Sequence, residues 1–128
     1  MEINLKQEIS LKHFEEIIVT ALECGSNYWY LIKISDFSSK LSSGGGETLS
    51  MRIALSLFQN MEFKLPVYDK ENEDELLGIV TQSSMLEALE IAHKDYSHHY
   101  YDLMEGQGDA DTADIIFQLA VMKEIIFG

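Results

Sequence analysis

Cysteine is nearly absent from this chain: Cys24 is the only one among 128 residues, so no disulfide can form within the chain. The opening residues, MEINLKQEIS, mix charged and apolar side chains and lack the apolar run of a secretion signal. We therefore expect a reducing compartment and a cytoplasmic protein. No apolar segment approaches the roughly 20 residues that span a bilayer, because Lys33, Lys123 and Glu124 interrupt the longest ones. We expect no membrane association.

Basic residues are also scarce. Nine lysines and arginines stand against 22 aspartates and glutamates, which gives a formal net charge of −13 at pH 7. Arg52 is the only arginine. A protein that binds a nucleic-acid backbone needs a basic face that displaces counterions, so this composition argues against nonspecific nucleic-acid binding.

Most of the negative charge falls between residues 69 and 114. This stretch has thirteen acidic residues against two lysines, for a net charge of −11. The acidic residues are Asp69, Glu71, Glu73, Asp74, Glu75, Glu87, Glu90, Asp95, Asp102, Glu105, Asp109, Asp111 and Asp114. Such a segment favours a protein partner with a basic surface, attracted over long range. The alternative is that the acidity serves only solubility.

The apolar pattern predicts a single α+β domain over residues 1–128, because a chain with 46% hydrophobic residues can bury one core at this length. Alternation predicts strands near 1–9, 28–34, 64–69 and 76–81, with the last two forming an antiparallel hairpin around an acidic turn. Apolar residues three and four apart predict four helices, near 11–24, 49–60, 84–104 and 111–127. The expected helix N-caps are Ser10, Ser84 and Asp111, and Gly25 is the expected left-handed C-cap.

The segment 35–50 is rich in serine and glycine and is predicted to be a flexible loop. Its three successive glycines, Gly44–Gly46, are followed by glutamate and threonine. A phosphate-binding loop has lysine and then serine or threonine at that point, so the composition favours a linker.

The last predicted helix is unusual because residues 115–127 are apolar on almost every side. A soluble domain accommodates such a helix only when neighbours cover several faces, so we expect it at the centre of the core. Asp111, Asp114 and Gln118 form one polar stripe at its start, since they are three and four residues apart. The stripe can bind a ligand or a cation. Alternatively, the aspartates are helix caps and Gln118 is a core amide with satisfied hydrogen bonds.

Other patterns predict neither a metal nor a catalytic site. The sequence DADTAD lacks the glycine and the glutamate that a calcium loop requires at its later positions. His93, His98 and His99 lack the four-residue spacing of two zinc ligands on one helix, although His98 with Asp102, or Asp95 with His99, has the spacing of a pair. Cys24 has no recognisable base beside it in sequence. We predict no metal and no cofactor, and we favour a noncatalytic role over an enzyme.

Three segments, ALECGSNYWYLI, LPVYD…ENEDELLGIVT and DADTADIIFQLAVMKEIIFG, resemble a group of small phage, prophage and mobile-element proteins of uncharacterised function. In that group the first segment reads EGGSNYWY and the last reads ADTADxxxQ. This chain shares Glu23, 25–30, 111–114 and Gln118 with these patterns, while Cys24 replaces a glycine. The resemblance implies a phage or mobile-element origin and a shared fold, and it implies no activity.

We predict that the CGSNYWY segment meets the start of the last helix. The candidate ligand-binding residues are then Asn27, Tyr28, Trp29, Asp111, Asp114 and Gln118. An aromatic platform beside carboxylate and amide acceptors suits a planar group with hydrogen-bond donors, such as a base or an arginine side chain. In the alternative packing Trp29 is buried, Asn27 caps the last helix and no ligand binds. The sequence thus predicts a noncatalytic interaction protein that binds a host protein through its acidic surface. The alternative is a small-ligand protein, including a nucleotide-binding protein or hydrolase.

Overall fold

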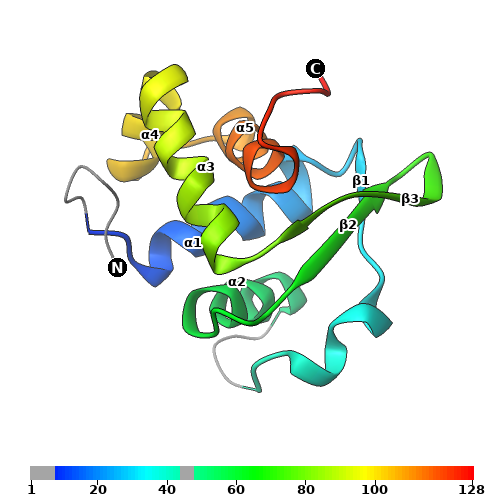
Figure 1. The fold of residues 1–128 in the computed structure, drawn as a ribbon. Coiled ribbons are helices and arrows are strands. Elements are labelled where there is room, and N and C mark those ends of the chain that lie inside the picture. Colours follow the sequence, from blue (N-terminus) through cyan, green and yellow to red (C-terminus); the bar gives the residue numbers. More distant parts are fainter. Residues whose placement is uncertain (1–7, 44–47) are drawn as a thin grey trace.

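The computed structural model describes residues 8–43 and 48–128. In these ranges the chain forms one α+β domain with five α-helices and a three-stranded antiparallel sheet (Figure 1). The strand expected at 1–9 and the three glycines at 44–46 lie almost entirely outside the described residues. No helix within these two ranges has the length and apolar character needed to cross a membrane.

The first helix, α1 (Leu11–Thr20), begins after Ser10 as predicted and continues into a π-helical turn, Ala21–Gly25. Gly25 is not the left-handed cap that the sequence predicts, since among the described glycines only Gly106 has a positive φ. Instead, Gly25 lies against the start of the last helix. A Cβ at this position would be 2.5 Å from the carbonyl oxygen of Ala110. Glycine is therefore required for the close approach of two backbone segments.

The sheet has the order β1–β2–β3, with β1 (Tyr30–Leu31), β2 (Leu65–Asp69) and β3 (Asn72–Val80). The predicted hairpin is confirmed, but β3 begins four residues earlier than expected, so most of the acidic turn belongs to the strand. The strand expected at 28–34 shrinks to two residues. The N–H groups of Trp29 and Tyr30 both donate to the carbonyl of Ser26, which makes residues 26–30 a turn.

The second helix, α2 (Leu49–Gln59), confirms the prediction at 49–60, and the Thr48 hydroxyl accepts the Met51 N–H at 3.2 Å. The preceding segment, expected to be a flexible loop, contains two 3₁₀ turns, Ile34–Asp36 and Ser38–Lys40. Phe37 lies between these turns and is buried in the core. One aromatic side chain therefore anchors a segment whose composition indicates a loop.

The single helix predicted at 84–104 is two helices, α3 (Gln82–Asp95) and α4 (Ser97–Met104). They are separated at Tyr96, whose φ of −138° and ψ of 49° are not helical. The expected cap at Ser84 is also wrong. The cap is Thr81, which accepts the Ser84 N–H at 3.1 Å while its own N–H donates to the Ser84 hydroxyl at 2.8 Å.

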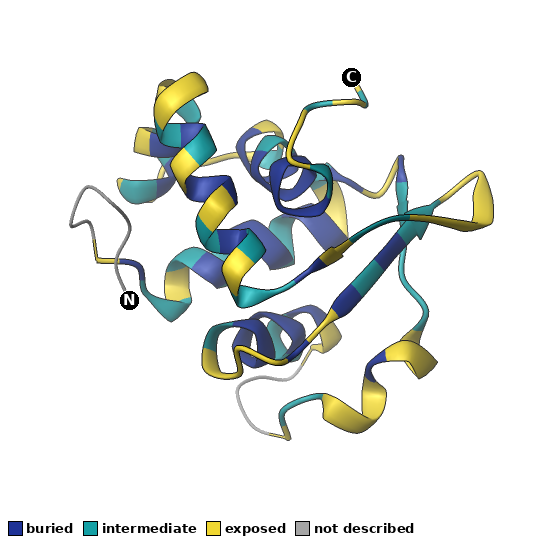
Figure 2. Ribbon diagram, in the orientation of Figure 1, coloured by how far each residue is buried: buried dark blue, intermediate teal, exposed yellow. Residues whose placement is uncertain are grey.

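The last helix, α5 (Ala110–Met122), is central, as predicted. It contacts α1, α3, α4, β3 and the π-helical turn, and nine of its 13 residues are buried (Figure 2). Two boundaries differ from the prediction. The N-cap is Asp109 instead of Asp111, and the helix ends at Met122 because Lys123 adopts a left-handed conformation with φ 66°. Residues 123–128 form a tail that turns back along the helix (Figure 1).

Protonation of His13 is expected to destabilise the start of α1. Its Nδ1 accepts the Ser10 N–H at 3.0 Å, which only a ring unprotonated at Nδ1 can do. Burial lowers the pKa of His13 from its usual 6.5. The unfolded chain therefore takes up this proton at a higher pH than the folded protein, so the stabilisation is complete above pH 6.5 and is lost as the pH falls below it.

The matched control is His13→Gln, whose side-chain oxygen can accept the same hydrogen bond without titrating. Urea denaturation between about pH 7 and pH 5 should give a steeper loss of unfolding free energy for the natural protein than for this variant. Parallel pH profiles would contradict the role assigned to His13.

Candidate functional site

The carboxylate of Asp114 is the centre of a polar cluster between the CGSNYWY segment and α5. Asp114 is only 8% exposed. Its Oδ1 accepts hydrogen bonds from the Ser26 hydroxyl and from Nε1 of Trp29, both at 2.7 Å. Its Oδ2 accepts from the Tyr28 hydroxyl at 2.6 Å and from Nε2 of Gln118 at 3.2 Å. The prediction that these two segments meet is confirmed.

The start of α5 determines which aspartate faces inward. The Asp109 carboxylate accepts the Thr112 N–H at 3.0 Å, and this hydrogen bond holds the pKa of Asp109 below its usual range. Because the helix begins there, Asp111 lies in the first turn and is exposed. Its carboxylate forms no hydrogen bond or ion pair within the described part of the chain. Asp114 lies one turn further on and faces the turn at 26–30.

The amide of Gln118 binds the tail. Its Oε1 accepts the N–H groups of Ile126 and Phe127, each at 2.9 Å, and its Nε2 donates to the Phe127 carbonyl at 2.9 Å. These bonds explain why the predicted continuation of the helix to residue 127 is wrong, since the tail backbone bonds to a side chain instead of extending the helix. Gln118 is therefore the satisfied core amide that the sequence offered as an alternative.

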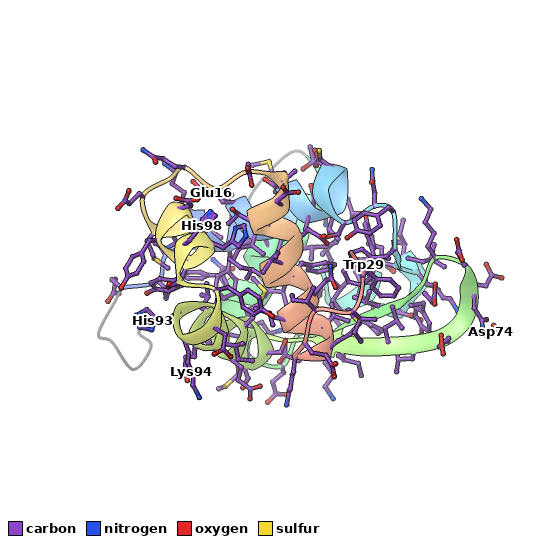
Figure 3. All side chains as sticks on the ribbon, turned by 90° about the horizontal axis from the view of Figure 1, so that it is seen from above. Glu16, Trp29, Asp74, His93, Lys94 and His98 are labelled. Carbon is purple, nitrogen blue, oxygen red and sulfur yellow. The ribbon has the colours of Figure 1, made fainter. Side chains whose placement is uncertain are left out.

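Trp29 is buried and its ring is covered. It is 2% exposed, it stacks on Phe127 with centroids 5.2 Å apart and planes 10° apart, and it also contacts Phe117 at 5.5 Å. In Figure 3, Trp29 lies on one side of α5, and His98 of α4 lies on the other. The faces of the indole are therefore covered, and Trp29 offers no open platform on which a ligand could stack. In this respect the structure agrees with the alternative packing, in which Trp29 is buried. Asn27 differs from both expectations. It is exposed, and its backbone carbonyl accepts from Nζ of Lys70 at 2.7 Å.

Tyr28 connects this cluster to solvent, since it is 48% exposed. Desolvation of its hydroxyl, together with the hydrogen bond to the Asp114 carboxylate, raises the pKa of Tyr28 to about 12. The hydroxyl therefore remains a protonated donor throughout the neutral range.

A pocket of about 700 Å³ adjoins the cluster at Tyr28. Its walls come from the segment 25–28, α4, residues 111–118 of α5 and the tail. The lining residues are Gly25, Tyr28, His98, His99, Asp111, Asp114, Ile115, Gln118, Ile125, Phe127 and Gly128. Four of the six predicted site residues line it, whereas Trp29 and Asn27 do not. The pocket joins segments that are separated by more than half of the chain.

The sequence did not indicate that His98 and His99 share a site with α5. Their rings stack with centroids 4.4 Å apart. Nδ1 of His99 lies 2.9 Å from the Thr112 hydroxyl, and Nε2 of His98 lies 3.4 Å from Asp102. The four-residue spacing of His98 and Asp102 is visible in the sequence. The contact between His99 and Thr112 crosses from one helix to another and has no sequence signal.

Within the described ranges, no group of three or more histidine, cysteine, aspartate or glutamate side chains is arranged to hold a metal ion. Comparison of the chain with family models, curated proteins and solved structures gives no match.

Replacing Asp114 with asparagine should strongly destabilise the domain. In the variant, the NH₂ group of asparagine replaces one carboxylate oxygen and cannot accept a hydrogen bond. At least one buried donor that now bonds to that oxygen would then lose its partner. We expect a loss of about 2–4 kcal/mol in unfolding free energy by urea denaturation, followed by the fluorescence of the single tryptophan.

The matched control is Asp111→Asn, which makes the same chemical change on the same helix at an exposed position. Its unfolding free energy should stay within about 0.5 kcal/mol of that of the natural protein. Equal stabilities for the two variants would show that the hydrogen bonds to Asp114 do not hold the segments together.

Proposed function

We propose that this protein is a small noncatalytic interaction protein whose acidic hairpin binds a basic surface on a protein partner. The proposal rests on the position of the negative charge in the fold. The hairpin formed by β2 and β3 extends beyond the helices (Figure 1), and its tip bears four exposed carboxylates. These belong to Glu71, Glu73, Asp74 and Glu75.

The pairing of the hairpin supports its use as a binding element. Tyr68 pairs with Leu76, but the next residue of β2, Asp69, pairs with Asn72. Residues 73–75 therefore have no counterpart on β2 and form an acidic bulge at the strand edge. Bulges commonly redirect side chains at sheet edges and beside functional sites.

The cation nearest in sequence does not neutralise this bulge. Lys70 is in the turn of the hairpin, and its Nζ donates to the backbone carbonyl of Asn27 at 2.7 Å and forms no ion pair with a described carboxylate. Elsewhere in the acidic stretch, Glu87 pairs with Lys123 at 3.4 Å and Asp102 lies 3.4 Å from His98. In Figure 3, Asp74 lies at the opposite end of the molecule from His93 and Lys94. The hairpin tip is thus a separate concentration of negative charge, and such a surface attracts a basic partner over a Debye length.

The alternative of a nucleotide-binding protein or hydrolase has less support. The pocket lining includes two aspartates and neither lysine nor arginine. Phosphate groups would meet negative potential there. Asp114 and Gln118, which the sequence offered as ligand-binding groups, already bond to the protein itself. The phage or mobile-element origin remains part of the proposal and rests on the resemblance of the three sequence segments.

The test is affinity capture from a lysate of the host at low and high ionic strength. The hairpin variant carries Glu71→Gln, Glu73→Gln, Asp74→Asn and Glu75→Gln. We expect the natural protein to retain one basic protein at low salt and to release it at high salt, and the hairpin variant to bind it at least about tenfold more weakly.

A control variant with the same net charge separates the hairpin from general acidity. It carries Glu62→Gln, Asp95→Asn, Glu105→Gln and Glu124→Gln, all at exposed positions outside β2, β3 and the turn between them. This control should capture the partner as the natural protein does. Equal weakening of both variants, or no effect of either, would overturn the assignment of binding to the hairpin.

A further inference from the structure

We infer that the pocket beside α5 binds an organic cation, a protonated amine or a guanidinium group carried on a short aliphatic chain. This site is separate from the hairpin, and the inference does not depend on the proposed function.

The inference rests on a buried negative charge without a cationic partner. The oxygens of Asp114 already accept hydrogen bonds from the protein, so Asp114 acts on a ligand through its charge, and Asp111 supplies the carboxylate that a ligand can contact. Asp114 is 8% exposed, and its four hydrogen-bond donors are two hydroxyls, an indole and an amide, all of which are neutral. No ion pair joins it to a lysine or an arginine within the described ranges. Hydrogen bonds from neutral groups stabilise a carboxylate but leave its net charge, so the neighbouring space retains a negative potential.

That potential is reinforced on the pocket side. Asp111 lines the same pocket, and its carboxylate forms no hydrogen bond or ion pair with a described residue. It is close enough to Tyr28 to contribute, after the larger effects of desolvation and Asp114, to the raised pKa of that hydroxyl. Two carboxylates thus act on one volume whose lining contains no lysine or arginine. A cation is the ligand that this charge favours.

The other residues that line the pocket favour a cation that has both polar and apolar parts. His99 is oriented by its 2.9 Å contact between Nδ1 and the Thr112 hydroxyl, and its Nε2 has no hydrogen-bond partner among the described residues. The half-exposed ring of Tyr28 offers a face for a cation. Ile115, Ile125 and Phe127 supply apolar surface for hydrocarbon. The volume of about 700 Å³ lies in the range of small-molecule sites.

The same chemistry can come from a free polyamine-like molecule or from an arginine side chain of a peptide. The experiment therefore uses both sources. Agmatine carries a guanidinium and an amine on a four-carbon chain, and the peptide acetyl-Gly-Arg-Gly-amide carries one arginine without free termini. Glutarate, a dicarboxylate of similar length, is the ligand of opposite charge. Binding is measured by isothermal titration calorimetry and by NMR of the Tyr28 and His99 resonances.

We expect saturable binding of agmatine, of the peptide or of both, with shifts at Tyr28 and His99, and no binding of glutarate. Asp111→Asn should weaken that binding about tenfold or more, whereas Asp95→Asn, the same change at an exposed position outside the pocket, should leave it unchanged. Binding of agmatine alone would identify the ligand as a free organic cation, and binding of the peptide alone would identify it as an arginine side chain. Absence of saturable binding by both cations would overturn the inference, as would equal binding by Asp111→Asn and the natural protein.

Discussion

The hydrogen bonds that converge on the Asp114 carboxylate are the interaction on which the rest of this structure depends. Ser26, Tyr28 and Trp29 come from the turn after the first helix, and Gln118 comes from one turn further along α5. Without that acceptor, the Ser26 hydroxyl and the indole N–H would be buried without a partner, at a cost of about 1–3 kcal/mol each. The carboxylate therefore fixes the turn to the helix and also determines where Trp29 can lie.

The consequences extend to the turn at Gly25 and to the C-terminal tail. Gly25 permits the backbone of the turn to approach Ala110, and Phe127 covers the indole while Gln118 holds the tail backbone. The same arrangement separates the acidic residues into different physical roles. Asp109 caps α5, Asp114 joins two segments, and Asp111 is left facing a pocket. The carboxylates of Glu71, Glu73, Asp74 and Glu75 at the hairpin tip have none of these structural roles and form no hydrogen bond or ion pair with a described residue.

The fold class, the central helix and the meeting of two distant segments could be predicted from the sequence. The fold class depends on the alternation and the three-and-four spacing of apolar residues, and the central helix depends on the nearly uniform apolar character of 115–121. The spacing of Asp111, Asp114 and Gln118 by three and four residues indicated a polar stripe where the other segment meets the helix. Errors occurred where tertiary contacts override local preference. Ile125, Ile126 and Phe127 continue the apolar pattern of the helix, but the backbone of Ile126 and Phe127 bonds to Gln118. Tyr28 and Trp29 have strand propensity, but they lie in a turn that is closed by hydrogen bonds from the N–H groups of Trp29 and Tyr30 to the carbonyl of Ser26.

The pocket was beyond sequence reasoning for a related reason. His99 contacts Thr112 of α5, and both His98 and His99 line the pocket with Tyr28. The periodicity of a sequence gives no information on such contacts between separate elements. Likewise, the spacing of Asp111 and Asp114 reveals a shared helix face, whereas only the position of the cap at Asp109 determines which of them is buried. The sequence therefore predicted the neighbourhood of the site more reliably than the state of each side chain in it.

The most direct test of the central claim is a double-mutant cycle between Trp29→Phe and Asp114→Asn. Unfolding free energies of the four proteins would be measured by urea denaturation, followed by far-ultraviolet circular dichroism because one variant lacks the tryptophan. A hydrogen bond to a buried carboxylate predicts a coupling energy of about 1.5–3 kcal/mol. Additive effects, within about 0.5 kcal/mol, would contradict the account, since the indole and the carboxylate would then act independently.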